Sequence, residues 1–109
     1  MALPHALPAQ AIDVRPLGPR LASEKSVALF KSDDLEVIRM VLLAGKSLPS
    51  HQVPGALVLH CVEGQLEVSV DSQLHALHAG QLLHLPGSVP HAVLAIQDSS
   101  ALLTIVVRK

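Results

Sequence analysis

The stretch LHALHAGQLLHLPGSVPHAV, residues 74–93, decides the fold because it alternates short apolar runs with turn residues. LHAL is followed by Gly80, and Pro86-Gly87 separates QLLHL from the run that begins at His91. Apolar runs of about 4–8 residues bounded by Gly and Pro are typical of strands, because stable helices are usually longer. The stretch therefore predicts three consecutive strands.

The same pattern extends in both directions from this stretch. Leucine is a good helix former, but the close spacing of the turns favours strands over helices. Regular turns between short strands predict an all-β sandwich or barrel. The other apolar runs are SVALFK (26–31), LEVIRMVLLA (35–44), ALVLHCVE (56–63), QLEVSV (65–70) and ALLTIVV (101–107).

Residues 1–22 differ from the rest because they contain four prolines, at positions 4, 8, 16 and 19. Proline at that density disfavours a helix and favours an extended segment. Apolar residues such as Ile12, Val14 and Leu17 indicate that this segment packs on something. We predict an N-terminal arm over residues 1–22 and one barrel domain over residues 23–109.

The composition excludes several partners. The net charge is −1 and the eight basic residues form no run, so neither nucleic acid nor an anionic membrane has a basic surface to bind. No apolar stretch approaches the roughly 20 residues of a membrane span, and the first residues do not resemble a signal peptide. Cys61 is the only cysteine, which excludes a disulfide within the chain. We expect a soluble, cytoplasmic protein.

In ALVLHCVEG, residues 56–64, strand alternation determines on which face of the strand the side chains of His60 and Cys61 lie. A strand places residues 57, 59 and 61 on one face and residues 58, 60 and 62 on the other. His60 and Cys61 therefore cannot bind one metal ion together. Glu63, next to the turn at Gly64, is expected to be solvated.

Two spaced motifs resemble those of the cupin superfamily. The first cupin motif is G-x5-H-x-H-x3,4-E-x6-G, and here Gly45 and His51 keep its spacing, as do Leu57 and Gly64. The second is G-x5-P-x-G-x2-H-x3-N, and here Gly80, Pro86 and His91 keep its spacing. Gly87 precedes the second motif's glycine position, which Ser88 occupies, and Ala95 stands at its asparagine position.

This resemblance implies a single cupin-type jelly-roll β-barrel of the RmlC-like kind, with the arm as an N-terminal addition. It also implies a homodimer, since small cupins often cover an apolar outer face with a second copy. Cupins have many unrelated functions, so the resemblance specifies neither substrate nor reaction.

The resemblance implies a metal site of three histidines and one glutamate, of which this chain keeps His51 and His91. Val53 and Leu57 stand at the other two positions, and neither side chain can donate to a metal. Tight metal centres normally use three or four protein ligands. No cofactor is therefore expected, although a weakly bound divalent transition metal on His51 and His91 stays open.

By motif position and strand alternation, the barrel interior should present an apolar pocket for a small molecule that carries one polar group. Two functions follow. One is small-molecule binding at a degenerate metal site, without catalysis. The alternative is a metal-dependent enzyme of oxygenase, isomerase or decarboxylase type with a reduced ligand set, whose catalytic residues the sequence does not identify. The predicted lining is His51, Val53, Leu57, Leu59, Cys61, His91 and Val93.

Overall fold

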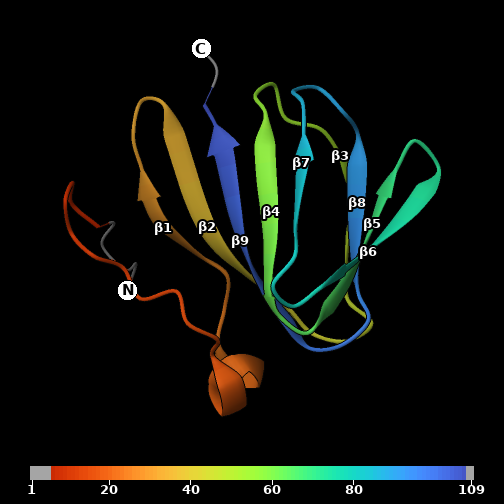
Figure 1. The fold of residues 1–109 in the computed structure, drawn as a ribbon, viewed down its shortest axis with the longest axis horizontal. Helices are drawn as coiled ribbons and strands as arrows, with labels where there is room; N and C mark the ends of the chain where they lie inside the picture. Colours follow the sequence, from red (N-terminus) through yellow and green to blue (C-terminus); the bar gives the residue numbers. More distant parts are fainter. Residues whose placement is uncertain (1–5, 108–109) are drawn as a thin grey trace.

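The computed structural model describes residues 6–107, and strands dominate it (Figure 1). It confirms the predicted all-β fold, and every apolar run identified in the sequence overlaps a strand. Within the described residues the elements are a 3-10 helix η1 (Gly18–Ser23) and the strands β1 (Val27–Lys31), β2 (Leu35–Leu42), β3 (Ser47–His51), β4 (Leu57–Glu63), β5 (Gln65–Val70), β6 (Gln73–His78), β7 (Leu82–Leu85), β8 (His91–Ala95) and β9 (Ser99–Val106).

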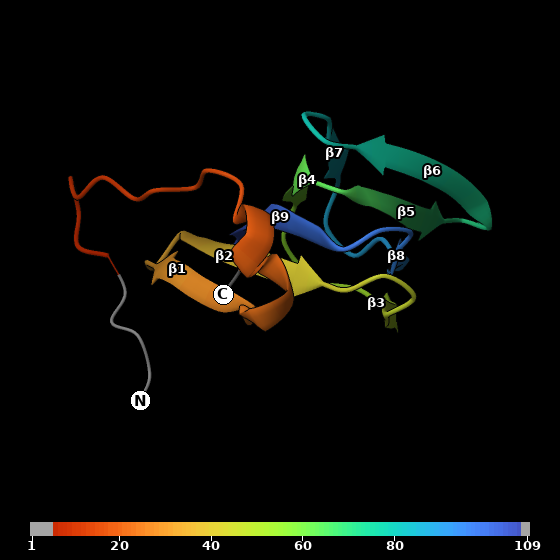
Figure 2. The same ribbon diagram turned by 90° about the horizontal axis from the view of Figure 1, so that it is seen from below.

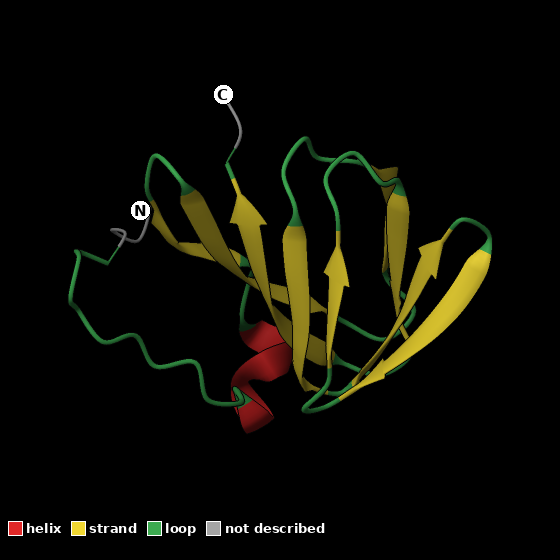
Figure 3. Ribbon diagram, turned by 45° about the horizontal axis from the view of Figure 1, so that its top comes forward, coloured by secondary structure: helices red, strands yellow, loops and turns green. Residues whose placement is uncertain are grey.

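The strands form two antiparallel sheets that face each other (Figure 3). The five-stranded sheet has the order β1-β2-β9-β4-β7, and the four-stranded sheet has the order β3-β8-β5-β6. Neighbours such as β4 and β9 are far apart in sequence, which is the connectivity of a jelly roll.

The core lies between the sheets and consists of aliphatic side chains. On β4 the residues Leu57, Leu59 and Cys61 are buried while the residues between them are half-buried, as the predicted alternation requires. Leu66 and Val68 of β5 face them with no exposed surface. The core is therefore filled by closely packed aliphatic side chains, without the aromatic residues that many cores of this size contain.

Strand β3 was not predicted. Its sequence SLPSH contains Pro49, which has no N–H group to donate to a neighbouring strand. The structure accommodates this proline because β3 is the edge of its sheet and pairs only with β8, with an irregular register between Leu48 and His51.

The N-terminal arm is not extended throughout, because residues 18–23 form the 3-10 helix η1. Pro19 lies in its first turn, where the missing N–H group costs nothing. The side chains of Leu17 and Leu21 are buried. Figure 2 shows the helix of the arm beside the five-stranded sheet. Residues 1–5 of the predicted arm lie outside the described residues.

Glu63 fixes the arm to the barrel and is half-buried, whereas the sequence indicated only a solvated side chain. Its carboxylate accepts the backbone N–H groups of Leu17 and Gly18 at 2.8 and 3.0 Å, and the hydroxyl of Ser100. A β-bulge between Cys61 and Glu63 pairs Glu63 with Ser100 instead of continuing the register. On the same sheet, the Arg39 guanidinium donates to the Asp13 carbonyl at 2.9 Å.

Replacing Glu63 with alanine should lower the free energy of unfolding by roughly 2–3 kcal/mol, because three donors lose a charged acceptor. Burial raises the pKa of Glu63, but the bonds from Ser100, Leu17 and Gly18 and the charge of Arg39 hold it below its ordinary value of 4.5. The part of this contribution that depends on the negative charge is therefore present above pH 4.5 and should be lost as the pH falls through the lowered pKa. Urea unfolding from pH 7 to pH 3 measures it.

Glu67→Ala is the matched control for Glu63→Ala. Glu67 lies on the next strand and its carboxylate accepts no hydrogen bond in the described chain, so its replacement should change stability by less than about 0.5 kcal/mol. Equal effects of the two substitutions at pH 7, or an effect of Glu63→Ala that does not decrease as the pH falls below 4.5, would contradict the anchoring role.

No helix in the part of the chain that the structure describes is long and apolar enough to cross a membrane.

Candidate functional site

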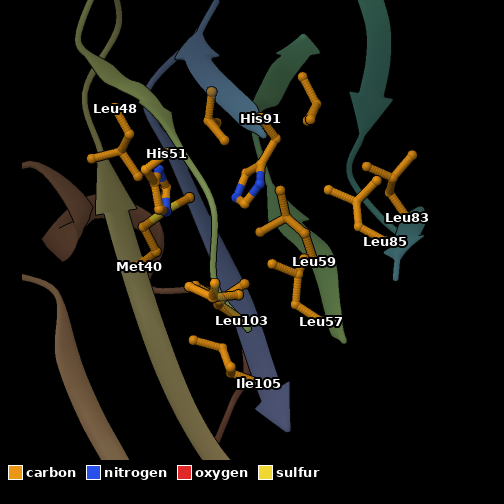
Figure 4. A pocket seen from close by; sticks show the side chains of 13 residues that line it. Met40, Leu48, His51, Leu57, Leu59, Leu83, Leu85, His91, Leu103 and Ile105 are labelled. Atoms are coloured by element: carbon orange, nitrogen blue, oxygen red, sulfur yellow. The ribbon is translucent and has the colours of Figure 1, made fainter. Parts of the chain in front are cut away.

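A pocket opens between the two sheets, and its wall is apolar except for two histidines (Figure 4). The cavity itself has a volume of about 40 Å³, and the unfilled space is about 450 Å³ when the open mouth is included. It is therefore narrow. The lining residues are Met40, Leu48, His51, Val53, Leu57, Leu59, Val68, Leu83, Leu85, His91, Val93, Leu103 and Ile105.

The structure brings six of the seven sequence-predicted pocket residues together around this space: His51, Val53, Leu57, Leu59, His91 and Val93. They come from β3, β4 and β8 and from the segment that follows β3. All four metal-ligand positions of the two motifs thus border one cavity.

Cys61 was the exception and does not line the pocket. Its thiol is fully buried and lies 3.5 Å from the Glu63 carbonyl oxygen, at the other end of β4. Four residues of strand span about 13 Å, so Cys61 shares the facing of Leu57 without reaching the same space. Burial raises the pKa of the Cys61 thiol, which makes it an inert core residue.

His51 and His91 meet because they are register partners across β3 and β8. Their ring centroids are 4.5 Å apart and the ring planes are tilted by 52°. His91 is only 5% exposed, whereas His51 is exposed at the mouth of the pocket. Figure 4 shows both side chains pointing toward the space that the leucines surround.

Each imidazole is oriented by a backbone carbonyl two residues earlier in the chain. Nδ1 of His51 lies 3.1 Å from the Pro49 oxygen, and Nδ1 of His91 lies 3.1 Å from the Val89 oxygen. A carbonyl oxygen can only accept, so Nδ1 carries the hydrogen in both rings.

A sequence profile of the cupin domain matches residues 38–107, well over half of the chain. The chain is a cupin. No curated protein matches its sequence.

Solved structures of other proteins are similar to this cupin over most or all of its chain. A conserved protein of unknown function from Streptococcus pyogenes is 22% identical, with a TM-score of 0.76 over 100% of this chain and 96% of that one. A cupin superfamily protein from Desulfitobacterium hafniense is 20% identical, with a TM-score of 0.75 over 89% and 94%. An RmlC-like cupin from Desulfovibrio desulfuricans is 25% identical, with a TM-score of 0.75 over 89% and 96%.

The sequence reasoning missed part of the wall of the cupin pocket. Leu103 and Ile105 of β9 are the register partners of Leu59 and Leu57, and Leu83 and Leu85 of β7 flank the same pair on the other side. Alternation within each strand could have identified them only if the order of the strands had been known.

The residues present do not fit a tight metal centre. Val53 and Leu57 border the cavity where a cupin with a full metal site has donors, and they place methyl groups there. Within residues 6–107, no three His, Cys, Asp or Glu side chains come together in a way that could hold a metal ion. Two imidazoles alone are fewer than the three or four protein ligands that such centres use.

The displaced glycine of the second motif has a structural explanation. Ser88, at the motif's glycine position, has a φ of 63°, the left-handed region that favours glycine. Gly87 is required for a different reason, because a Cβ there would overlap the Pro54 carbonyl oxygen. The Ser88 N–H group donates to the Val53 oxygen at 2.7 Å, so this turn holds Val53 beside the pocket.

Proposed function

We propose that this cupin binds a small, largely apolar molecule in the pocket between its sheets, at a metal site whose ligand set has been reduced to His51 and His91. The observation that carries the proposal is the chemistry of the wall. Eleven of the thirteen lining residues are Leu, Val, Ile or Met, and the two polar ones face each other. Such a wall favours apolar ligand atoms and orients a single polar group.

The alternative is a metal-dependent enzyme of the oxygenase, isomerase or decarboxylase type. That function needs a metal that stays bound through turnover, and replacing two donors by apolar groups removes much of the chelate and disfavours a nearby ion. The donor set therefore supports binding without catalysis over metal-dependent catalysis.

Toluene is a suitable first probe because it is apolar and compact, and because its ring is larger than the narrow cavity, the aliphatic side chains at the open mouth must move apart to admit it. Titration of methyl-labelled protein with toluene should shift the methyl signals of Leu57, Leu59 and Leu103, which line the pocket. The methyls of Val58 and Leu102 alternate to the other face and should not move. No shift of the pocket methyls up to the solubility limit of toluene would contradict the proposal.

A matched pair of variants locates the binding. Leu103→Phe adds bulk to the pocket wall and should abolish the toluene shifts, whereas Leu102→Phe places the same side chain on the opposite face of the same strand and should leave them intact. Binding that survives Leu103→Phe and disappears in Leu102→Phe would place the ligand outside the barrel.

We also propose that two copies pair through the outer face of the five-stranded sheet. Strand alternation and register support a continuous, largely apolar face there. Leu82 is 63% exposed on it. The arm crosses this sheet near Arg39 and Glu63 and also meets β1, where the Ala6 N–H group donates to the Leu29 oxygen at 2.9 Å. The residues of this outer face beyond the arm are Leu35, Val37, Val58, His60, Leu82, His84, Leu102, Thr104 and Val106.

Light scattering at micromolar concentration should give about twice the chain mass of 11.5 kDa. Leu82→Glu should shift the protein toward the monomer, because a charge in an apolar contact is costly. Leu74→Glu is the control, since Leu74 is 65% exposed but lies on the other sheet. A monomer at every concentration would refute the dimer.

A further inference from the structure

The two histidines present their lone pairs to the pocket. Because Nδ1 of each ring donates to a carbonyl oxygen, Nε2 of the neutral imidazole has no hydrogen and is an acceptor. Neither Nε2 has a hydrogen-bond partner among residues 6–107. The polar part of the pocket wall therefore consists of two hydrogen-bond acceptors, the Nε2 atoms of His51 and His91.

The Nε2 atom of His91 is open to the pocket. His91 is 5% exposed, yet no fully buried side-chain nitrogen or oxygen in the described chain lacks a partner. Its unpartnered Nε2 must therefore touch accessible space, and that space is the cavity His91 lines. His51 lies nearer to solvent, so water can satisfy its Nε2 when a ligand is bound.

The rest of the wall supplies no donor, since the other lining side chains are aliphatic or thioether groups. Beside neutral imidazoles a carboxylate head group would thus face acceptors only, and it could gain a hydrogen bond only by binding together with a proton. A hydroxyl group has the hydrogen that His91 Nε2 lacks, and it carries no charge into the apolar space.

We propose that the pocket selects a neutral hydroxyl compound with an apolar body, such as a phenol or an alcohol, whose O–H group donates to Nε2 of His91. This inference rests on the proposed binding function and adds the chemical class of the ligand. The pocket should bind such a hydroxyl compound more tightly than a carboxylate of the same size.

Phenol, benzoate and toluene share a ring and differ in the head group, which makes them matched probes. Phenol should bind about five- to tenfold tighter than toluene at pH 7.5, the gain expected from one added hydrogen bond, and benzoate should bind more weakly than both. His91→Phe keeps a flat ring and removes the acceptor. It should reduce the phenol affinity to that of toluene. His60→Phe, on the outer face of the barrel, should leave all three affinities unchanged.

Nitrogen-15 NMR of the imidazoles tests the same point without a variant. The wild-type protein should show Nδ1 protonated and Nε2 unprotonated in both rings, and phenol should shift the Nε2 signal of His91. This measurement remains decisive if His91→Phe does not fold.

The outcomes separate the two proposals. If toluene binds but phenol gains nothing over it, or if benzoate binds tighter than phenol, the ligand class is wrong and the binding function stands. A hydrogen on Nε2 of His91 would also overturn the ligand class alone. If none of the three probes binds, the binding function fails and the inference that rests on it fails too.

Discussion

The double variant Val53→His/Leu57→Glu should bind one equivalent of Zn²⁺ or Ni²⁺ per chain, which the wild-type protein should not do. Both positions border the cavity that holds His51 and His91, so the substitutions complete a set of three nitrogen donors and one carboxylate. Isothermal titration calorimetry measures the stoichiometry. Because Leu57 is only 4% exposed, the metal-free variant should be less stable than wild type, and added metal should restore part of the loss.

Val53→His/Leu59→Glu is the matched control for the metal-binding variant. Leu59 also lines the pocket and is 3% exposed, but it lies two residues further along β4 than the motif position. It should bind metal more weakly than Val53→His/Leu57→Glu. A correctly folded Leu57→Glu double variant that takes up no metal would show that the first motif has been assigned to the wrong residues.

Gly64→Ala should be among the most destabilising single substitutions in the barrel, with a loss of more than roughly 3 kcal/mol. Gly64 has a φ of 84°, and an added Cβ would overlap the Asp98 carbonyl oxygen and the Ser99 hydroxyl. Neither neighbour can give way easily, because Ser99 is 1% exposed and its hydroxyl donates to the Gln97 oxygen at 2.7 Å. Urea unfolding at pH 7 measures the loss.

Gly80→Ala separates the two causes of the Gly64 effect. Gly80 has a φ of 88°, but a Cβ added there would meet no heavy atom within 4 Å, so its substitution should cost only the backbone strain, about 1–2 kcal/mol. If the two alanine variants were equally stable, the contact with Asp98 and Ser99 would have no energetic role.

Local sequence signals predicted most of the fold. Turn residues and apolar runs located strands such as β4 and β9, because a buried strand needs branched aliphatic residues and a chain reversal needs Gly or Asp. Strand β3 was missed since edge strands tolerate proline and polar residues. The role of Glu63 depends on a bulge and on contacts 45 and 46 residues away, which no local pattern contains.

The candidate site was predictable to the extent that motif spacing encodes geometry. The positions of His51, Val53, Leu57 and His91 border one cavity, as their spacing implies. Cys61 was misplaced, because alternation fixes the face of a strand but not the distance along it. The orientation of the imidazoles depends on the backbone oxygens of Pro49 and Val89, and side-chain patterns carry no information about these.

Metal content tests the central claim that the ligand set of this cupin is too small to retain a metal. The protein should be purified without added metal, dialysed against a mild chelator and subjected to elemental analysis. We expect less than about one-tenth of an equivalent of any transition metal per chain, because two imidazoles alone form a weak site. One equivalent of iron, manganese, nickel, copper or zinc that disappears in both His51→Ala and His91→Ala would contradict the claim and favour the metal-dependent enzyme.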